Sequence, residues 1–330
     1  MLSMALIIII ALALTFEFTN GFQDTANAIA TSIYTRAMSP RNAIMLAAVM
    51  NFFGALAGEK VAATISKGLI YVTLPEYVIA SALIAATVWN IVATLNAIPI
   101  SCSHALIGGL LGSAISYTSS FKSVIWSGVI KKVLIPLVSS PLLGFFIGFS
   151  IMSAIFKLFV GLSYGRVNKI FLRLQLVSAA FVAFSHGNND AQKTMGVITM
   201  ALISSSVLPA TAGVPLWVKF ICALTMALGT AAGGRKVIKT MGGKVTRLEP
   251  ASGFSAQTAA AIVIEGASFI GAPVSTTQAI TATIMGAGAA KRISAVKWGV
   301  AKNIVAAWII TLPATMLLGG LISFLLAKIF

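Results

Sequence analysis

Four of the seven acidic residues in this 330-residue chain lie inside or beside apolar stretches, namely Glu17, Asp24, Asp190 and Glu265. A carboxylate in hydrocarbon is costly, so such a group must face a cavity, pair with another group or bind a cation. For Glu17 and Glu265, burial at a contact between helices explains the position equally well. Asp24 and Asp190 are therefore the first candidates for a cation site.

The two aspartates have similar neighbours in the sequence. Each follows a glycine by three residues, and glycine allows a helix to break or to approach a neighbour closely. Both also lie among side-chain amides: Asn20, Gln23 and Asn27 in one case, Asn188, Asn189 and Gln192 in the other. Carboxylate and amide oxygens, with the carbonyls that a broken helix exposes, suit a hard cation. We expect a coupling sodium ion or a proton relay at Asn20, Gln23, Asp24, Asn27 and Asp190, and no other metal or cofactor.

Two further elements have the chemistry of an anion site, "PISCSHA" at 99–105 and "PVSTTQA" at 273–279. Proline ends a preceding helix and starts a new one well. The free N–H groups and hydroxyls of a new helix attract anions. One such element alone would indicate ordinary capping, but its duplication favours binding of a tetrahedral oxyanion. The predicted anion ligands are Ser101, Cys102, Ser103, Ser275, Thr276 and Thr277, with Asn188 and Asn189.

These motifs belong to a duplication that covers the chain. "NGFQD" at 20–24 matches "HGNND" at 186–190, and the two proline elements match position for position. "GALAGEKV" and "WSGVIKKV" in the first half resemble "GTAAGGRKV" and "KWGVAKNI" in the second, in the same order. Four matches in order indicate an internal repeat.

Charge bias predicts that the two repeats are inverted. The loop at 235–247 carries five basic residues, whereas its counterpart at 59–67 has two, offset by Glu59. Loops rich in Lys and Arg face the cytoplasm, so the two loops are expected on opposite sides of a membrane. Inverted repeats are typical of secondary transporters, with the binding site at the midplane between the halves.

The composition requires lipid as the main solvent. Hydrophobic residues make up 58% of the chain and charged residues only 9%, against about 25% in soluble domains. At about 20 residues a span, we predict an all-α integral membrane protein with on the order of ten spanning helices. These form two inverted repeats, 1–156 and 174–330, with discontinuous or re-entrant helices and a basic cytoplasmic linker at 157–173. The net charge of +16 is spread over short loops, which argues against a nucleic-acid partner and for a multi-pass protein of the inner (plasma) membrane.

The segments "GFQDTANAIATSIYTRAM" at 21–38 and "FSHGNNDAQKTMGV" at 184–197 resemble the two signatures of the PiT family of inorganic phosphate transporters. The likeness extends over nearly the whole chain and is strongest to bacterial low-affinity phosphate permeases. It implies phosphate symport with sodium or protons, in some members as a metal–phosphate complex. It also implies that Asp24, Asn27, Asn189 and Asp190 serve the cation and nearby substrate, and that the serines and threonines of the proline elements contact phosphate. Cys102, Ser103, Gln278 and Gln23 depart from residues common in the family.

Several alternatives stay open at this stage. A carrier of a related oxyanion such as sulfate would use the same helix ends. His104 and His186 are candidate proton carriers, and Lys193 is either an ion-pair partner of Asp190 or a phosphate contact. An enzyme is disfavoured, because the side chains of the adjacent Ser103 and His104 diverge and no hydrolase motif occurs. A passive channel would need no duplicated sites.

The expected partners are phosphate, the coupling cation and membrane lipid, and the sequence leaves open whether two copies form a homodimer.

Overall fold

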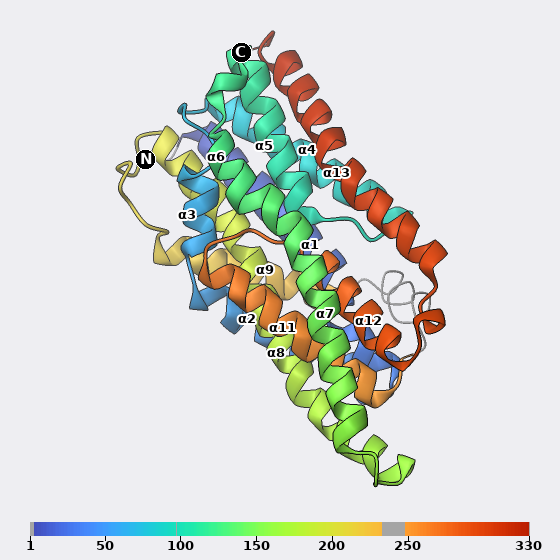
Figure 1. The fold of residues 1–330 in the computed structure, drawn as a ribbon. Helices are drawn as coiled ribbons and strands as arrows, with labels where there is room; N and C mark the ends of the chain where they lie inside the picture. Colours follow the sequence, from blue (N-terminus) through green and yellow to red (C-terminus); the bar gives the residue numbers. More distant parts are fainter. Residues whose placement is uncertain (1–2, 97, 233–247, 330) are drawn as a thin grey trace.

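The computed structural model describes residues 3–96, 98–232 and 248–329, except for the side chains of residues 25–27. The basic loop expected at 235–247 lies outside the described residues. Within the described part, helices of one repeat recur in the same order in the other (Figure 1). The first repeat contains α1 (Met4–Tyr34), α2 (Pro40–Ala57), α3 (Lys60–Lys67), α4 (Glu76–Leu95), α5 (Cys102–Thr118), α6 (Trp126–Val129) and α7 (Ile135–Leu158). The second contains α8 (Tyr164–Ser204), α9 (Leu216–Ala232), α11 (Pro250–Phe269), α12 (Thr276–Lys291) and α13 (Trp298–Leu326).

The two repeats run in opposite directions. The Glu76 carboxylate accepts hydrogen bonds from Ser3, just before α1, and from Ser205, just after α8. The start of α1 and the end of α8 therefore lie at the same end of the molecule. The turn between α7 and α8 lies at the opposite end, at the bottom of Figure 1. The inverted-repeat prediction is confirmed.

Helices α5 and α12 begin in the interior and run to opposite ends. Tyr117, in the last turn of α5, contacts Tyr77 at the start of α4, with ring centroids 6.2 Å apart. Lys291, at the end of α12, instead forms an ion pair of 2.6 Å with Glu249, just before α11. Residues 102–114 and 276–289 are buried throughout, so both helices are enclosed by protein on all sides. α13 and α4 cover α5, and α7 and α11 cover α12.

Five described helices are long and apolar enough to cross a membrane: α1, α4, α8, α13 and the continuous helix Trp126–Leu158. The pair α2 and α3, bent by 65°, is a sixth candidate, and α9 is apolar but shorter. Large apolar side chains cover the outside, as Phe146 on α7 (62% exposed) and Leu317 on α13 (77% exposed) illustrate. Together these features indicate a multi-pass membrane protein.

Some details differ from the sequence-based expectations. α1 and α8 continue as helices through Asp24 and Asp190, so of the two roles expected for the motif glycines, a helix break is not found. Pro141 and Pro313 lie inside helices that continue past them. Residues 164–173 of the predicted linker form the first turns of α8.

The motif glycines instead allow close packing. A Cβ on Gly187 of α8 would lie 2.2 Å from the carbonyl oxygen of Asn51 in α2. A Cβ on Gly21 of α1 would lie 2.6 Å from the carbonyl oxygen of Met226 in α9. Each aspartate-bearing helix thus touches the backbone of a neighbour one turn before its carboxylate.

Candidate functional site

The starts of α5 and α12 form the centre of the site. Ser101 caps α5 by accepting a hydrogen bond from the backbone N–H of His104, at 3.2 Å. Ser275 caps α12 in the same way, accepting from the N–H of Gln278 at 3.3 Å. The prediction that each proline element begins a helix is therefore confirmed. His104 and Gln278 hold matched positions in the two repeats, and their side-chain nitrogens lie 3.4 Å apart. The two helix starts thus face each other across the pseudo-symmetry axis.

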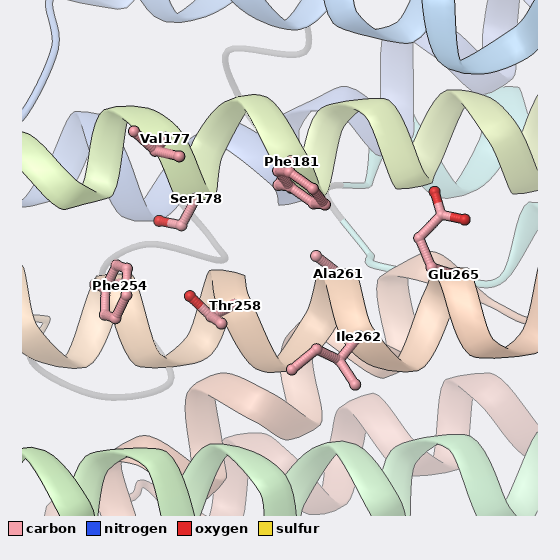
Figure 2. A pocket seen from close by; sticks show the side chains of 8 residues that line it. All are labelled: Val177, Ser178, Phe181, Phe254, Thr258, Ala261, Ile262 and Glu265. Atoms are coloured by element: carbon pink, nitrogen blue, oxygen red, sulfur yellow. The ribbon is translucent and has the colours of Figure 1, made fainter. Parts of the chain in front are cut away.

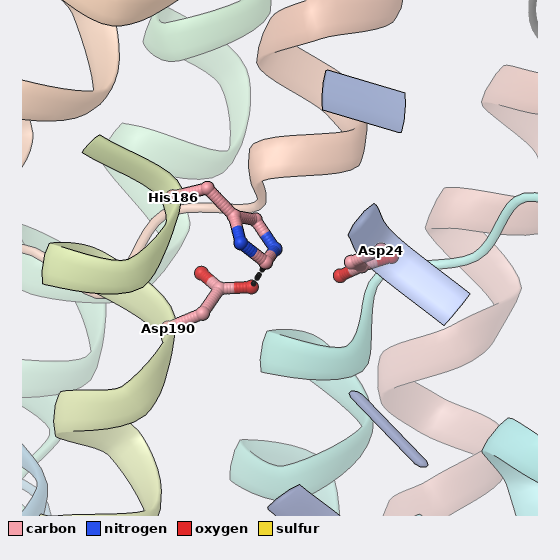
Figure 3. A group of neighbouring side chains, drawn as sticks. All are labelled: Asp24, His186 and Asp190. Carbon is pink, nitrogen blue, oxygen red and sulfur yellow. Dashed lines mark ion pairs between the residues drawn. The ribbon is translucent and has the colours of Figure 1, made fainter. Parts of the chain in front are cut away.

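The two predicted aspartates lie beside these helix starts. Thr277 donates to Asp24 Oδ1 at 2.8 Å, and Thr276 donates to Asp190 Oδ2 at 3.2 Å. Figure 3 shows Asp24 of α1 facing Asp190 and His186 of α8. One ligand atom from each of these three buried side chains lies within 4.8 Å of the others. Carboxylates this close repel one another unless a cation or proton lies between or beside them.

A lysine already lies next to one of these carboxylates. The ammonium group of Lys193 is 2.5 Å from Asp190 Oδ1, and the side chain is 1% exposed. It also donates to Ser103 Oγ and, at 2.9 Å, to the carbonyl oxygen of Val274. Of the two sequence-based interpretations of Lys193, the structure shows the ion pair with Asp190.

A series of polar contacts extends from Asp190 through His186 and Asn51 to α9. His186 Nε2 is 3.4 Å from Asp190 Oδ2, and His186 Nδ1 is 3.0 Å from Asn51 Oδ1. Asn51 in turn donates to Thr230 of α9 at 2.9 Å. Asn51 and Thr230 are not among the site residues predicted from the sequence. A polar residue within an apolar helix could have indicated them, because such a residue lies either at a contact between helices or in a site.

A third acidic group lies in the same interior. Glu17 of α1 is buried and accepts a hydrogen bond from Thr194, the residue after Lys193. Its other carboxylate oxygen, Oε1, has no hydrogen-bond partner among the described residues. The contact with Thr194 agrees with the interpretation of Glu17 as an acid buried between helices.

The remaining predicted site residues lie around this centre. Gln23 Oε1 accepts from Thr94 at 3.0 Å and from the Cys102 thiol at 3.7 Å. Asn189 donates to Ser268 at 2.9 Å and to the carbonyl oxygen of Ala272 at 3.2 Å. Asn20 is buried, and the side chain of Asn27 lies outside the described part. Within that part, the Asn20 Oδ1, Gln23 Nε2 and Asn189 Oδ1 atoms have no hydrogen-bond partner. Buried polar atoms of this kind are where a ligand or water is expected.

Asn188 lies farther out, at the mouth of a polar hollow of about 420 Å³. It donates to Glu265 Oε2 at 3.0 Å and receives a hydrogen bond of 2.8 Å from Gln192. Lys60 and Lys219 also line this hollow. Asn188 thus lines this hollow, and its described hydrogen bonds are to Glu265 and Gln192 rather than to the helix starts.

A second hollow of about 410 Å³ lies on the outside, between α8 and α11. Figure 2 shows Val177 and Phe181 on α8 opposite Phe254 and Ala261 on α11. Its lining is almost wholly apolar, with Glu265 at one end. An apolar groove on a membrane-facing surface suits hydrocarbon chains, so it is distinct from the polar centre.

Comparison with known proteins agrees with this architecture. The model of the phosphate transporter family matches the chain twice, at residues 20–164 and 162–319. A protein of Bacillus subtilis (strain 168) named "Probable low-affinity inorganic phosphate transporter" is 46% identical, with 98% of each chain covered. A protein of the same name from Rhizobium meliloti (strain 1021) is 45% identical over 96% of this chain and 95% of its own.

A solved structure named "The sodium-dependent phosphate transporter" superposes with a TM-score of 0.89 at 26% identity. The match covers 99% of this chain and 100% of the other. Two matches to one family model, in a chain whose halves are inverted copies, account for the paired motifs. The chain belongs to the phosphate transporter family.

Proposed function

We propose that this protein is a secondary active symporter of inorganic phosphate, driven by a sodium or proton gradient across the inner membrane. The observation that carries this proposal is the meeting of two helix starts with two buried aspartates. The backbone N–H groups at the starts of α5 and α12, with the hydroxyls of the capping residues Ser101 and Ser275, supply donors for an oxyanion. The carboxylates of Asp24 and Asp190 supply the adjoining cation site.

The charges of the site give a reason for coupling. The two facing aspartates and Lys193 together have a formal charge of minus one, not counting Glu17, which is buried nearby. A phosphate anion placed beside that charge is repelled, and the low dielectric of the interior strengthens the repulsion. A cation bound at Asp24 neutralises this charge and removes the repulsion. Phosphate and cation therefore favour each other's binding, which is the thermodynamic requirement for symport.

Sodium and a proton are both suitable driving ions. Asp24, the Thr277 hydroxyl and nearby amide oxygens are hard ligands of the kind that sodium takes. The similar solved structure is named as a sodium-dependent transporter, which supports sodium for this chain. His186 and His104 are the nearest groups for a proton route, and both are buried.

The orientation follows from the distribution of basic residues. The end where α7 meets α8 carries Lys157, Arg166, Lys169 and Arg173 in and beside the turn. Lys291 and Lys297 lie at the end of α12 and just before α13. We place this end in the cytoplasm by the positive-inside rule. The polar hollow at Lys60 and Lys219 then opens toward the outer side and forms the entry route for phosphate.

Reconstitution into liposomes tests the proposal. Labelled phosphate uptake is measured with an imposed sodium gradient and, separately, with a proton gradient, using protein-free liposomes as the control. We expect accumulation above the external concentration with one of the two gradients. Arsenate should compete and sulfate should compete poorly, because sulfate has no proton to donate to a buried carboxylate at neutral pH. Uptake that only equilibrates would indicate a channel, and equal inhibition by sulfate would contradict the assignment of phosphate.

A further inference from the structure

We infer that Lys193 is a tethered cation that permanently occupies one of two pseudo-symmetric cation positions. The other position, at Asp24, is then left for the exchangeable ion. The inference deepens the proposed symport and rests on it. It assigns Lys193 a role in setting the cation-to-phosphate ratio and excludes it as a phosphate ligand.

The hydrogen bonds of Lys193 are the first argument. An ammonium group has three N–H donors and no acceptor. Here it meets three oxygens, from Asp190 in α8, Ser103 in the first turn of α5 and Val274 just before α12. A carboxylate, a hydroxyl and a carbonyl are the ligands that a bound sodium ion would take. All three donors are used by the protein, so none remains for a phosphate oxygen.

The pseudo-symmetry is the second argument. Ser103 and Thr277 hold matched positions in the two proline elements, and each lies next to the aspartate of the other repeat. Thr277 donates directly to Asp24, at 2.8 Å. Ser103 and Asp190 are instead joined through the ammonium of Lys193. Between the matched hydroxyl and its aspartate, the second position therefore contains the Lys193 ammonium, whereas the first has a direct hydrogen bond.

The sequence shows what distinguishes the two positions. In the aligned motifs "NGFQDTAN" and "HGNNDAQK", Lys193 stands where the first repeat has Asn27. The first repeat has a neutral amide at this position, and in the proposed symport an ion from solution binds beside Asp24. The lysine in the second repeat balances Asp190 without one. The two halves thus differ in charge at a single matched position beside their aspartates.

A tethered cation changes the energetics of transport. A sodium ion that enters with phosphate is released on the far side and carries its charge across. A lysine moves with the protein in both directions and carries no net charge over a full cycle. Removing the lysine should therefore make the second position accept an ion from solution and should raise the cations moved per phosphate by one.

The test is Lys193→Asn, which gives the second motif the residue of the first. Reconstituted variant and wild type are compared for labelled phosphate uptake over a series of external concentrations of the driving cation. Wild-type uptake should depend hyperbolically on that concentration, and variant uptake sigmoidally. The cation gradient at which net phosphate flux stops is then measured at a clamped membrane potential. The cation-to-phosphate ratio obtained from it should be larger by one in the variant than in wild type. Lys122→Asn makes the same change at an exposed site after α5 and should behave as wild type.

Each other outcome overturns the inference. Uptake by Lys193→Asn with an unchanged cation dependence would show that Lys193 fills no cation position. Folded protein that no longer binds labelled phosphate, even at a saturating concentration of the driving cation, would show that Lys193 is a phosphate ligand. If the variant does not fold, the cation dependence of wild-type uptake still tests the inference. A sigmoidal dependence in wild type would mean that both positions take ions from solution, which would contradict it. Failure of wild type to accumulate phosphate under either gradient would instead contradict the proposed function.

Discussion

Thr277 and Asp24 are 253 positions apart in the sequence, yet the Thr277 hydroxyl donates a hydrogen bond of 2.8 Å to the Asp24 carboxylate. The bond links the start of α12, in one repeat, to the middle of α1, in the other. It joins a residue of the predicted anion site to a residue of the predicted cation site. Changes at either residue should therefore affect both sites, whereas Ser275, which caps α12, should affect the anion alone.

Asp24→Asn should abolish gradient-driven phosphate uptake. The substitution keeps size and hydrogen-bonding capacity but removes the charge that holds the cation in a low-dielectric site. Uptake into proteoliposomes is the measurement, and an unchanged elution profile in detergent shows that the variant is folded. Full gradient-driven uptake by this variant would mean that the Asp24 carboxylate is only structural.

Ser275→Ala should raise the phosphate concentration needed for half-maximal uptake by several-fold. One neutral hydrogen bond is lost, worth about 0.5–1.5 kcal/mol. The dependence on the driving cation should stay as in wild type, because Ser275 makes no described contact with either aspartate. Ser101→Ala is the matched variant in the other repeat. A changed cation dependence in both variants would contradict the division of the site into an anion part and a cation part.

Asp190→Asn should lower the melting temperature of the purified protein in detergent. It leaves the Lys193 ammonium buried without its carboxylate, and breaking a buried ion pair from one side costs about 3–5 kcal/mol. The double variant Asp190→Asn, Lys193→Met removes both charges and should recover most of the loss. Equal stability of the single variant and wild type would show that the ion pair does not stabilise the fold.

Gly187→Ala should disrupt the packing of α8 on α2 and reduce both stability and uptake. The new Cβ would lie 2.2 Å from the Asn51 carbonyl oxygen, so one helix must move. His186 and Asn51 would then lose their hydrogen bond of 3.0 Å. Gly266→Ala is the control, because its Cβ would meet nothing within 4 Å and alanine favours a helix by roughly 1 kcal/mol. The thermal midpoints of the two variants in detergent should move in opposite directions, and a fall in both would contradict this account.

Cysteines introduced at Lys60 and Lys297 should react with a membrane-impermeant maleimide from opposite sides of the membrane, the first from outside. Both lysines are exposed, and the native Cys102 and Cys222 are buried, so background labelling should be low. The assay uses intact cells and inside-out vesicles. Labelling of both positions from one side would contradict the proposed orientation.

Local chemistry explains which parts of the structure the sequence could predict. The proline elements contain their own start signals, and the structure begins α5 and α12 where they indicate. The inverted repeat was also predictable, because matched motifs and charge bias are visible without coordinates. The candidate aspartates could be chosen because a carboxylate in an apolar stretch requires an explanation.

Other features depend on distant partners and could not be predicted in this way. The segment 186–193 is polar enough to suggest a break, yet α8 continues through it because other helices supply partners for its side chains. Asn189 donates a hydrogen bond to Ser268, 79 residues away, and Lys193 donates one to Ser103, 90 residues away. A polar residue in an apolar helix is the only local sign of Asn51 and Thr230, and it does not show that they connect to Asp190 through His186. Such contacts arise only when the two repeats interlock.

The contact between Asp24 and Thr277 has a consequence for biogenesis. At about 5–20 residues synthesised per second, roughly 10–50 s pass between the emergence of Asp24 and that of its partner. During this time α1 must remain in the membrane before α12 can supply the hydrogen-bond partner of Asp24. The Ile- and Leu-rich first half of α1 is suited to anchor it, since each such residue favours insertion by about 0.3–0.6 kcal/mol. A nascent chain that stops before α12 would therefore carry exposed carboxylates in the bilayer, a feature by which membrane quality control could recognise it.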